Sequence, residues 1–186
     1  MQQSAQPSFI NYALNIWTQP KAVIRDILDT NPGLYVIPTT LLLGLIQGIG
    51  EGLAGMIIGL ILAVPMLYFS AFFTRWVGHW FGGVGSGEGI RTAIVWGGCI
   101  PGLQFAIALI ILVLVSNTLL SGTNLGQTVG IIFMGLYIVF GLWIWIISLK
   151  AIAEAHRFSS LKAFLTQITI GVIFTVPFLL FGLLFW

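Results

Sequence analysis

The side chains that could carry out ionic or acid–base chemistry are few, and most lie at the ends of apolar runs. The chain has 186 residues, with 7 Lys and Arg, 5 Asp and Glu, and 2 His. Glu51 ends the first apolar run, and a carboxylate near hydrocarbon is costly enough to indicate a functional site. It predicts a proton- or cation-binding site with Gln47 and Gln104 as buried hydrogen-bond partners. A solvated turn residue and a helix cap are the alternatives.

A second set of residues is basic and follows the second apolar run. Arg75 and His79 are four residues apart, so they share one helical face, and Arg91 precedes the third run. Arginines at this depth extend their guanidinium groups toward lipid phosphates, and tryptophans such as Trp76 and Trp80 anchor helices at the interface. Arg75, His79 and Arg91 therefore predict contacts with lipid headgroups, with simple anchoring as the alternative.

A third set lies between the last two apolar runs and predicts a face for a protein partner. It consists of Glu154, His156, Arg157 and Lys162. Glu154 and Arg157 are three residues apart, which is the spacing of an ion pair on a helix surface.

Motifs of known catalytic or cofactor-binding chemistry are absent from the sequence. It contains no HExxH, no GxSxG and no GxxxxGK[ST] segment. The glycine-rich run 82–89 has no preceding strand, so it predicts a flexible linker rather than a nucleotide-binding loop. We expect no enzyme activity, no cofactor, no metal site and no binding to nucleic acid.

Composition places the whole chain in a membrane. It is 58% hydrophobic and 6% charged, with mean hydropathy +1.05, whereas soluble domains carry about 25% charged residues. A membrane-spanning helix needs about 20 mostly apolar residues. The sequence predicts an all-α bundle of five transmembrane helices, at residues 34–50, 53–74, 92–115, 127–149 and 163–186.

The sequence also predicts what precedes this bundle and what holds its first two helices together. Residues 1–32 predict a cytoplasmic amphipathic region whose helix lies at the membrane interface or packs on the bundle, with a partner-binding segment as the alternative. Residues 33–186 are expected to form the membrane domain. Glycines at four-residue spacing on the first two runs predict a tight hairpin, because close backbone approach holds helices together in lipid. The same glycine faces could instead form a homo-oligomer.

The positions of the basic residues predict the orientation. Short loops that carry Lys and Arg stay in the cytoplasm, and all such residues can lie on one side of a five-helix bundle. The N-terminus is then cytoplasmic and Trp186 lies outside. Without a recognisable signal peptide, the first span would direct insertion, which is typical of a prokaryotic inner or cell membrane. The basic residues are Lys21, Arg25, Arg75, Arg91, Lys150, Arg157 and Lys162.

Three stretches resemble the Ypt-interacting-protein (Yip) domain family in its prokaryotic branch. They are residues 16–20 with the amphipathic helix that follows, residues 87–101 with their glycine-rich entry into a span, and residues 151–163 with an acid-x-His, aromatic, Ser and Lys-Ala pattern. The resemblance implies five spans and a cytosolic N-terminus. Eukaryotic members are associated with small GTPases, but the Asp-Leu-Tyr-Gly-Pro pattern of those members is absent here, so GTPase binding is not carried over.

Two hypotheses follow for the function. The first is a non-enzymatic protein that organises the membrane or binds a partner at its cytoplasmic face. The second is a small permease or a transporter of lipids or ions, for which prolines within the spans, the glycine ladders and Glu51 are the motivation.

Overall fold

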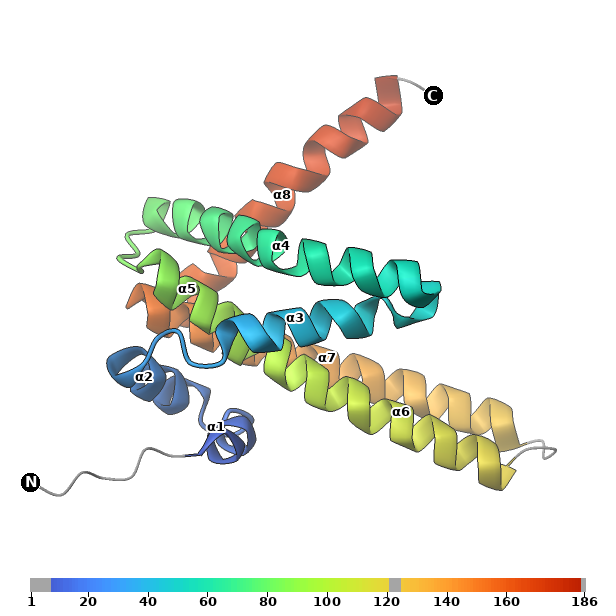
Figure 1. Ribbon diagram of the computed structural model, residues 1–186. Helices are drawn as coiled ribbons and strands as arrows, with labels where there is room; N and C mark the ends of the chain where they lie inside the picture. The colour runs from blue at the N-terminus through green and yellow to red at the C-terminus, as the bar shows by residue number, and fades with distance from the viewer. Residues whose placement is uncertain (1–7, 121–124, 185–186) are drawn as a thin grey trace, which may run out of the picture.

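The computed structural model describes residues 8–120 and 125–184, and this part of the chain contains helices and no strand (Figure 1). Two short helices, two helical hairpins and a final long helix follow one another along the chain. In order, the elements are α1 (Phe9–Asn15), α2 (Pro20–Thr30), α3 (Val36–Gln47), the 3₁₀ turn η1 (Ile49–Glu51), α4 (Gly52–Trp80), α5 (Gly87–Ile94), the π-helical turn η2 (Val95–Cys99), α6 (Ile100–Leu120), α7 (Leu125–His156) and α8 (Ser160–Leu184).

Four helical segments in the described ranges are long and apolar enough to cross a membrane, which identifies an integral membrane protein. They are Ile49–Trp80, Gly87–Leu112, Ile132–His156 and Ser160–Phe181. The first span expected from the sequence, residues 34–50, forms the shorter helix α3 instead. At 1.5 Å per residue its 12 residues extend about 18 Å, against about 30 Å of hydrocarbon.

The best-packed region of the molecule is the end where α4 ends, α5 begins, α7 ends and α8 begins, and we call it the basic end. Helix α2 lies against it, beside α5 and α7, and α1 packs beside α2 (Figure 1). Its core contains side chains with no exposed surface, among them Ile24, Ile27, Ile90, Trp96 and His156. Burial of this kind stabilises by about 25 cal/mol per Å² of apolar area.

Away from the basic end the long helices diverge. Hairpin α3–α4, hairpin α6–α7 and helix α8 point in different directions (Figure 1). In the most apolar stretch of each candidate span only 6% to 28% of residues are buried inside the chain. These faces are therefore covered by lipid or by other protein.

Hairpin α3–α4 is held by backbone contact, as the glycine spacing predicted. A side chain at Gly48 would overlap the backbone of Gly55, and one at Gly44 would overlap that of Gly59. The two helices therefore approach more closely than larger side chains allow, which is how helices gain van der Waals contact in lipid.

Helix α2 turns one face toward the bundle. Val23, Ile24 and Ile27 are buried there, whereas Lys21 and Arg25 are exposed. Pro20 occupies the first helical turn, as expected, because its missing N–H has no partner to lose there.

The segment between α2 and α3 is irregular, yet each of its carbonyl groups has a donor. The carbonyls of Asn31, Gly33 and Tyr35 accept from backbone N–H groups three or four residues ahead. The other two accept from side chains of the α5–η2 segment. The Thr92 hydroxyl lies between the carbonyls of Pro32 and Glu88 and shares its one proton with them, and Trp96 Nε1 donates to Leu34 at 2.8 Å. Residues 31–35 are thus tied to the core.

The π-helical turn η2 ends two residues before Pro101. Proline has no N–H to donate to the carbonyl four residues earlier, and here the N–H of Ile100 reaches back five residues to Val95. Gly97 faces Ser148 and Ala151 of α7 with no room for a side chain. The turn therefore lets α5 and α6 pass close to α7 around the buried Trp96.

Candidate functional site: the basic end and its two grooves

His156 is the central buried side chain of the basic end. Its imidazole fits against Gly78 at the end of α4 and against Gly83 and Gly85 in the loop to α5, and a Cβ on any of these glycines would collide with the ring or its neighbours. The N–H of Val84 also donates to the His156 carbonyl at 3.1 Å. The glycine-rich run, predicted as a flexible linker, instead begins with a packed cradle for this histidine.

Hydrogen bonds fix the protonation state of His156. The N–H of Gly85 donates to Nδ1 at 3.4 Å, so Nδ1 is an acceptor. Nε2 then carries the proton and donates to the Thr74 carbonyl at 3.2 Å. The histidine is therefore a neutral connector between α7, α4 and the loop. Because it has no exposed surface, it is not part of a partner-binding face.

The chain reverses after His156 through a helix-capping turn. Arg157 is in the left-handed region at φ 55°, its N–H bonds the Glu154 carbonyl, and the N–H of Phe158 bonds the Ala153 carbonyl. These two bonds form a Schellman motif, which usually has glycine at the left-handed position. Arg157 is exposed. Ser159 accepts from the N–H of Lys162 at 3.4 Å and caps α8, as expected.

Glu154 pairs with α2 rather than with its own helix. Arg25 Nε donates to Glu154 Oε1 at 2.7 Å, and this carboxylate raises the pKa of Arg25. The predicted pairing of Glu154 with Arg157 is not formed. A polar groove of about 430 Å³ lies along this contact, between α2 and the end of α7. Its lining residues are Arg25, Asp29, Ala153, Glu154, Arg157 and Phe158.

The two arginines predicted to contact lipid headgroups lie close together. Nη1 of Arg91 and Nη1 of Arg75 lie 3.6 Å and 3.9 Å from the position that a Cβ on Gly87 would take. His79 is one turn beyond Arg75, and its ring lies 6.1 Å from that of His156. Lys162 Nζ lies 3.7 Å from the Cβ position of Gly82.

The predicted acid–amide set is divided between two places. Glu51 is exposed in the turn before α4 and makes no side-chain cap bond. It shares a groove of about 400 Å³ with Gln47. Gln104, in contrast, accepts from Trp17 Nε1 at 2.7 Å and donates to the Ala13 carbonyl at 2.9 Å, so it holds the N-terminal segment on α6.

The N-terminal segment has one further polar contact that the sequence did not indicate. The Tyr12 hydroxyl donates to Asp26 Oδ2 at 2.5 Å and so joins α1 to α2. Burial, the hydrogen bond to this carboxylate and its charge raise the pKa of Tyr12 to about 12.

Sequence reasoning missed the histidine cradle, the pairing of Arg25 with Glu154 and an apolar pocket beside Cys99. Glycines at 78, 83 and 85 were the available signal for the cradle, because three glycines near one helix end allow close approach of another chain segment.

Within the described residues, no group of three or more His, Cys, Asp or Glu side chains is placed to hold a metal ion.

Comparison with known proteins places the chain in a family. No curated protein and no solved structure matches the chain. The sequence profile of the Yip1 domain matches residues 14–181. This match covers α2 to α7 completely, together with most of α8. The chain therefore belongs to the Yip1 domain family.

Proposed function

We propose that this protein is a non-enzymatic membrane organiser that crosses the bilayer five times and binds a protein partner at its cytoplasmic basic end. The observation that carries the proposal is the contrast between the two halves of the molecule. The basic end is packed around Trp96 and His156, whereas the apolar stretches of the spans are mostly unburied inside the chain. A rigid hub with divergent membrane helices is suited to hold other molecules in place.

The proposal of five spans rests on the segment before α3. Irregular backbone is tolerated at membrane depth only where its polar groups are satisfied within the protein. The carbonyls of residues 31–35 meet this condition through the donors described above. These bonds lower the cost of placing residues 31–35 below the headgroups, and the short helix α3 with the turn η1 would then complete the crossing.

The orientation follows from charge. Lys and Arg in short loops favour the cytoplasmic side, and the basic end gathers Arg25, Arg75, Arg91, Arg157 and Lys162. We therefore place α1 and α2 at the cytoplasmic interface and the C-terminus outside, in a prokaryotic cell membrane.

The groove between α2 and α7 is the partner site that we propose. It presents both charges, with Arg25 and Asp29 on α2 and Glu154 and Arg157 at the end of α7, beside the half-buried ring of Phe158. Arginine and aromatic side chains are enriched at protein interfaces, and their rims are polar. We further propose that the unburied span faces pair with other membrane helices or with copies of this chain.

Transport has less support than organisation. A solute pathway needs polar groups enclosed between the spans. Here Glu51 and Gln47 line a groove at an exposed turn, and Gln104 is occupied by Trp17 and the Ala13 carbonyl.

Photo-crosslinking in native membranes tests the proposal. A photoreactive phenylalanine analogue replaces Phe158 in the groove or, as the control, Ile49 at the opposite end, which is exposed. We expect a discrete protein adduct from position 158 that disappears when Arg157→Glu reverses the groove charge. Equal adducts from both positions, an adduct that survives the charge reversal, or adducts with lipid alone would contradict partner binding at this groove.

A further inference from the structure

Arg75 and Arg91 are two cations that lie close together without an acidic partner. Both Nη1 atoms are within 4 Å of the same point next to Gly87. The single ion pair among the described residues joins Arg25 to Glu154. Glu88 is the nearest acid in sequence, but its Oε1 lies 3.5 Å from the Cβ position of Gly33 instead. Because both guanidinium groups approach the same point, their like charges repel. An anion between them would therefore be favoured.

The space between the two arginines is open because Gly87 has no side chain. Gly87 is the first residue of α5, and Ser86 caps the helix by accepting from the Gly89 N–H at 3.0 Å. The start of a helix adds a partial positive charge to that of the guanidinium groups. Arg91 is held in place because its guanidinium carbon lies 4.5 Å from the centre of the Tyr68 ring.

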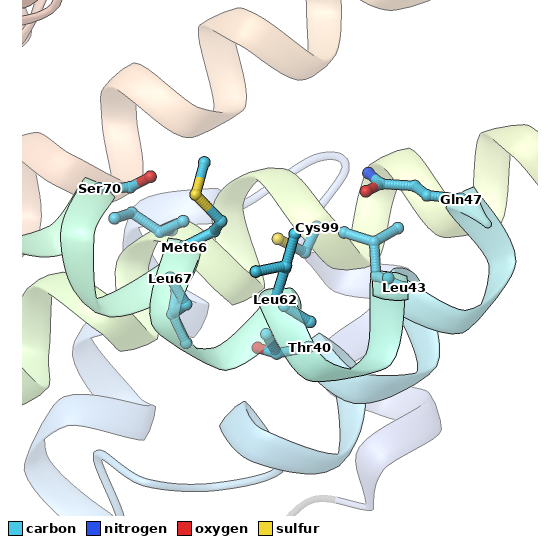
Figure 2. A pocket seen from close by; sticks show the side chains of 12 residues that line it. Thr40, Leu43, Gln47, Leu62, Met66, Leu67, Ser70 and Cys99 are labelled. Atoms are coloured by element: carbon cyan, nitrogen blue, oxygen red, sulfur yellow. The ribbon is translucent and has the colours of Figure 1, made fainter. Parts of the chain in front are cut away.

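An apolar pocket of about 390 Å³ begins one helical turn away. It lies between α3, α4 and η2, and Figure 2 shows side chains of α3 and α4 around Cys99. Its mouth is open, since Leu62 and Met66 are 50% and 57% exposed. The lining residues are Thr40, Leu43, Gly44, Gln47, Gly59, Leu62, Ala63, Met66, Leu67, Ser70, Ile94 and Cys99.

The arginine pair and the pocket lie next to each other along α4 and α5. On α5, Ile94 lines the pocket and follows Arg91 by one helical turn. On α4, Leu67 lines the pocket, and its neighbour Tyr68 carries the guanidinium group of Arg91 over its ring. From Arg75 to Leu62 the rise along α4 is about 20 Å at 1.5 Å per residue. One leaflet of the hydrocarbon core is about 15 Å thick. The groove thus has a cationic end at headgroup level and an apolar end at acyl-chain depth.

We propose that this groove binds one anionic glycerophospholipid, with its phosphate between Arg75 and Arg91 and an acyl chain in the pocket beside Cys99. An anionic headgroup is preferred because a zwitterionic one would bring a further cation to a site that already holds two. Thr40 does not compete for the ligand, because its hydroxyl donates to the Val36 carbonyl at 2.7 Å. The inference concerns a different groove from the partner site and does not depend on it.

Alkylation of Cys99 in the purified, detergent-solubilised protein tests the proposal. Cys99 is the single cysteine of the chain and lines the pocket, so a bound acyl chain shields it from N-ethylmaleimide. We expect phosphatidylglycerol to slow alkylation at least about tenfold, because each arginine near a headgroup favours anionic lipid. Phosphatidylcholine with the same acyl chains, and inorganic phosphate, should leave the rate unchanged.

A matched pair of variants separates the charge site from general attraction to anionic micelles. Arg75→Gln/Arg91→Gln should lose the shielding by phosphatidylglycerol, whereas Lys21→Gln, which removes an exposed charge on α2, should retain it. The comparison of lipids in the unaltered protein holds even if the double variant fails to fold.

Three results would overturn the proposal. Equal shielding by phosphatidylcholine would mean that the pocket takes acyl chains without regard to the headgroup. Shielding by inorganic phosphate would identify a free anion as the ligand. Unchanged alkylation with every lipid would mean that the pocket holds no acyl chain.

Discussion

At the scale of single residues, His156 explains why the glycines at the basic end have their positions. Its imidazole occupies the space that side chains at 78, 83 and 85 would need, and both ring nitrogens are hydrogen-bonded. The pattern acid-x-His at 154–156 therefore has two separate roles. Glu154 pairs with α2 at the surface, and His156 connects three segments inside.

We expect Gly83→Ala to destabilise the basic end. The added Cβ would overlap His156 Nδ1 and would lie 3.0 Å from the Gly78 carbonyl oxygen, and overpacking of this kind costs about 1–3 kcal/mol. Thermal unfolding in detergent measures the change.

Gly102→Ala is the control for this substitution, because no atom lies within 4 Å of its Cβ position. Alanine is favoured over glycine inside a helix by about 1 kcal/mol, so this variant should be as stable as the parent or more stable. If Gly83→Ala also raised the unfolding temperature, the cradle would not be a tight fit.

At the scale of elements, the sequence predicted the helices well and the contacts between them unevenly. Long apolar runs identified α4, α6, α7 and α8, because helices in lipid must satisfy their own backbone groups. Glycine spacing identified the α3–α4 hairpin, because the glycines that allow the close approach lie on two helices that are adjacent in sequence. The sequence predicted a slightly short first span, but not that its helix would begin at Val36. The carbonyls of Pro32 and Leu34, just before it, accept from Thr92 and Trp96, which are sixty residues away or more.

We expect Gly48→Ala to weaken the α3–α4 hairpin. A Cβ at this position would overlap the Gly55 carbonyl group, so the two helices would have to separate at a cost of about 1–3 kcal/mol. Unfolding by increasing amounts of sodium dodecyl sulfate in mixed micelles compares the variants.

Gly50→Ala is the matched control, since its Cβ position has no neighbour within 4 Å. It lies two residues away, in η1. Equal unfolding curves for the two variants would show that close backbone approach does not hold this hairpin.

At the scale of the whole molecule, charge and packing point to the same end. The basic residues were recognised as a group from the sequence, because their positions before, between and after the apolar runs can be read directly along the chain. Arg75 and Arg91 lie on consecutive helices and were grouped in advance as one set of lipid-headgroup contacts. The pairing of Arg25 with Glu154 was not predictable, because these residues lie on helices that are 129 positions apart in sequence.

The number of crossings determines where the termini lie. With five spans, labels at the N-terminus and after Trp186 are on opposite sides, whereas with four spans they are on the same side. In a Cys99→Ser background, single cysteines at Ser8 or after Trp186 can be treated with a membrane-impermeant maleimide in spheroplasts. We expect only the C-terminal cysteine to react before lysis. Reaction of both, or of neither, would mean that α3 does not complete a crossing.

The place of His156 in the chain also has a consequence for the order of assembly during synthesis. Its ring bonds Gly85 across 71 positions and Thr74 across 82. Until the ribosome has made residue 156, the loop after α4 therefore lacks the imidazole ring against which it packs. The first helices must enter the membrane with their basic end unlocked, and the arrival of the end of α7 completes it. A chain interrupted before residue 156 would lack this closure even if α3–α6 were already inserted.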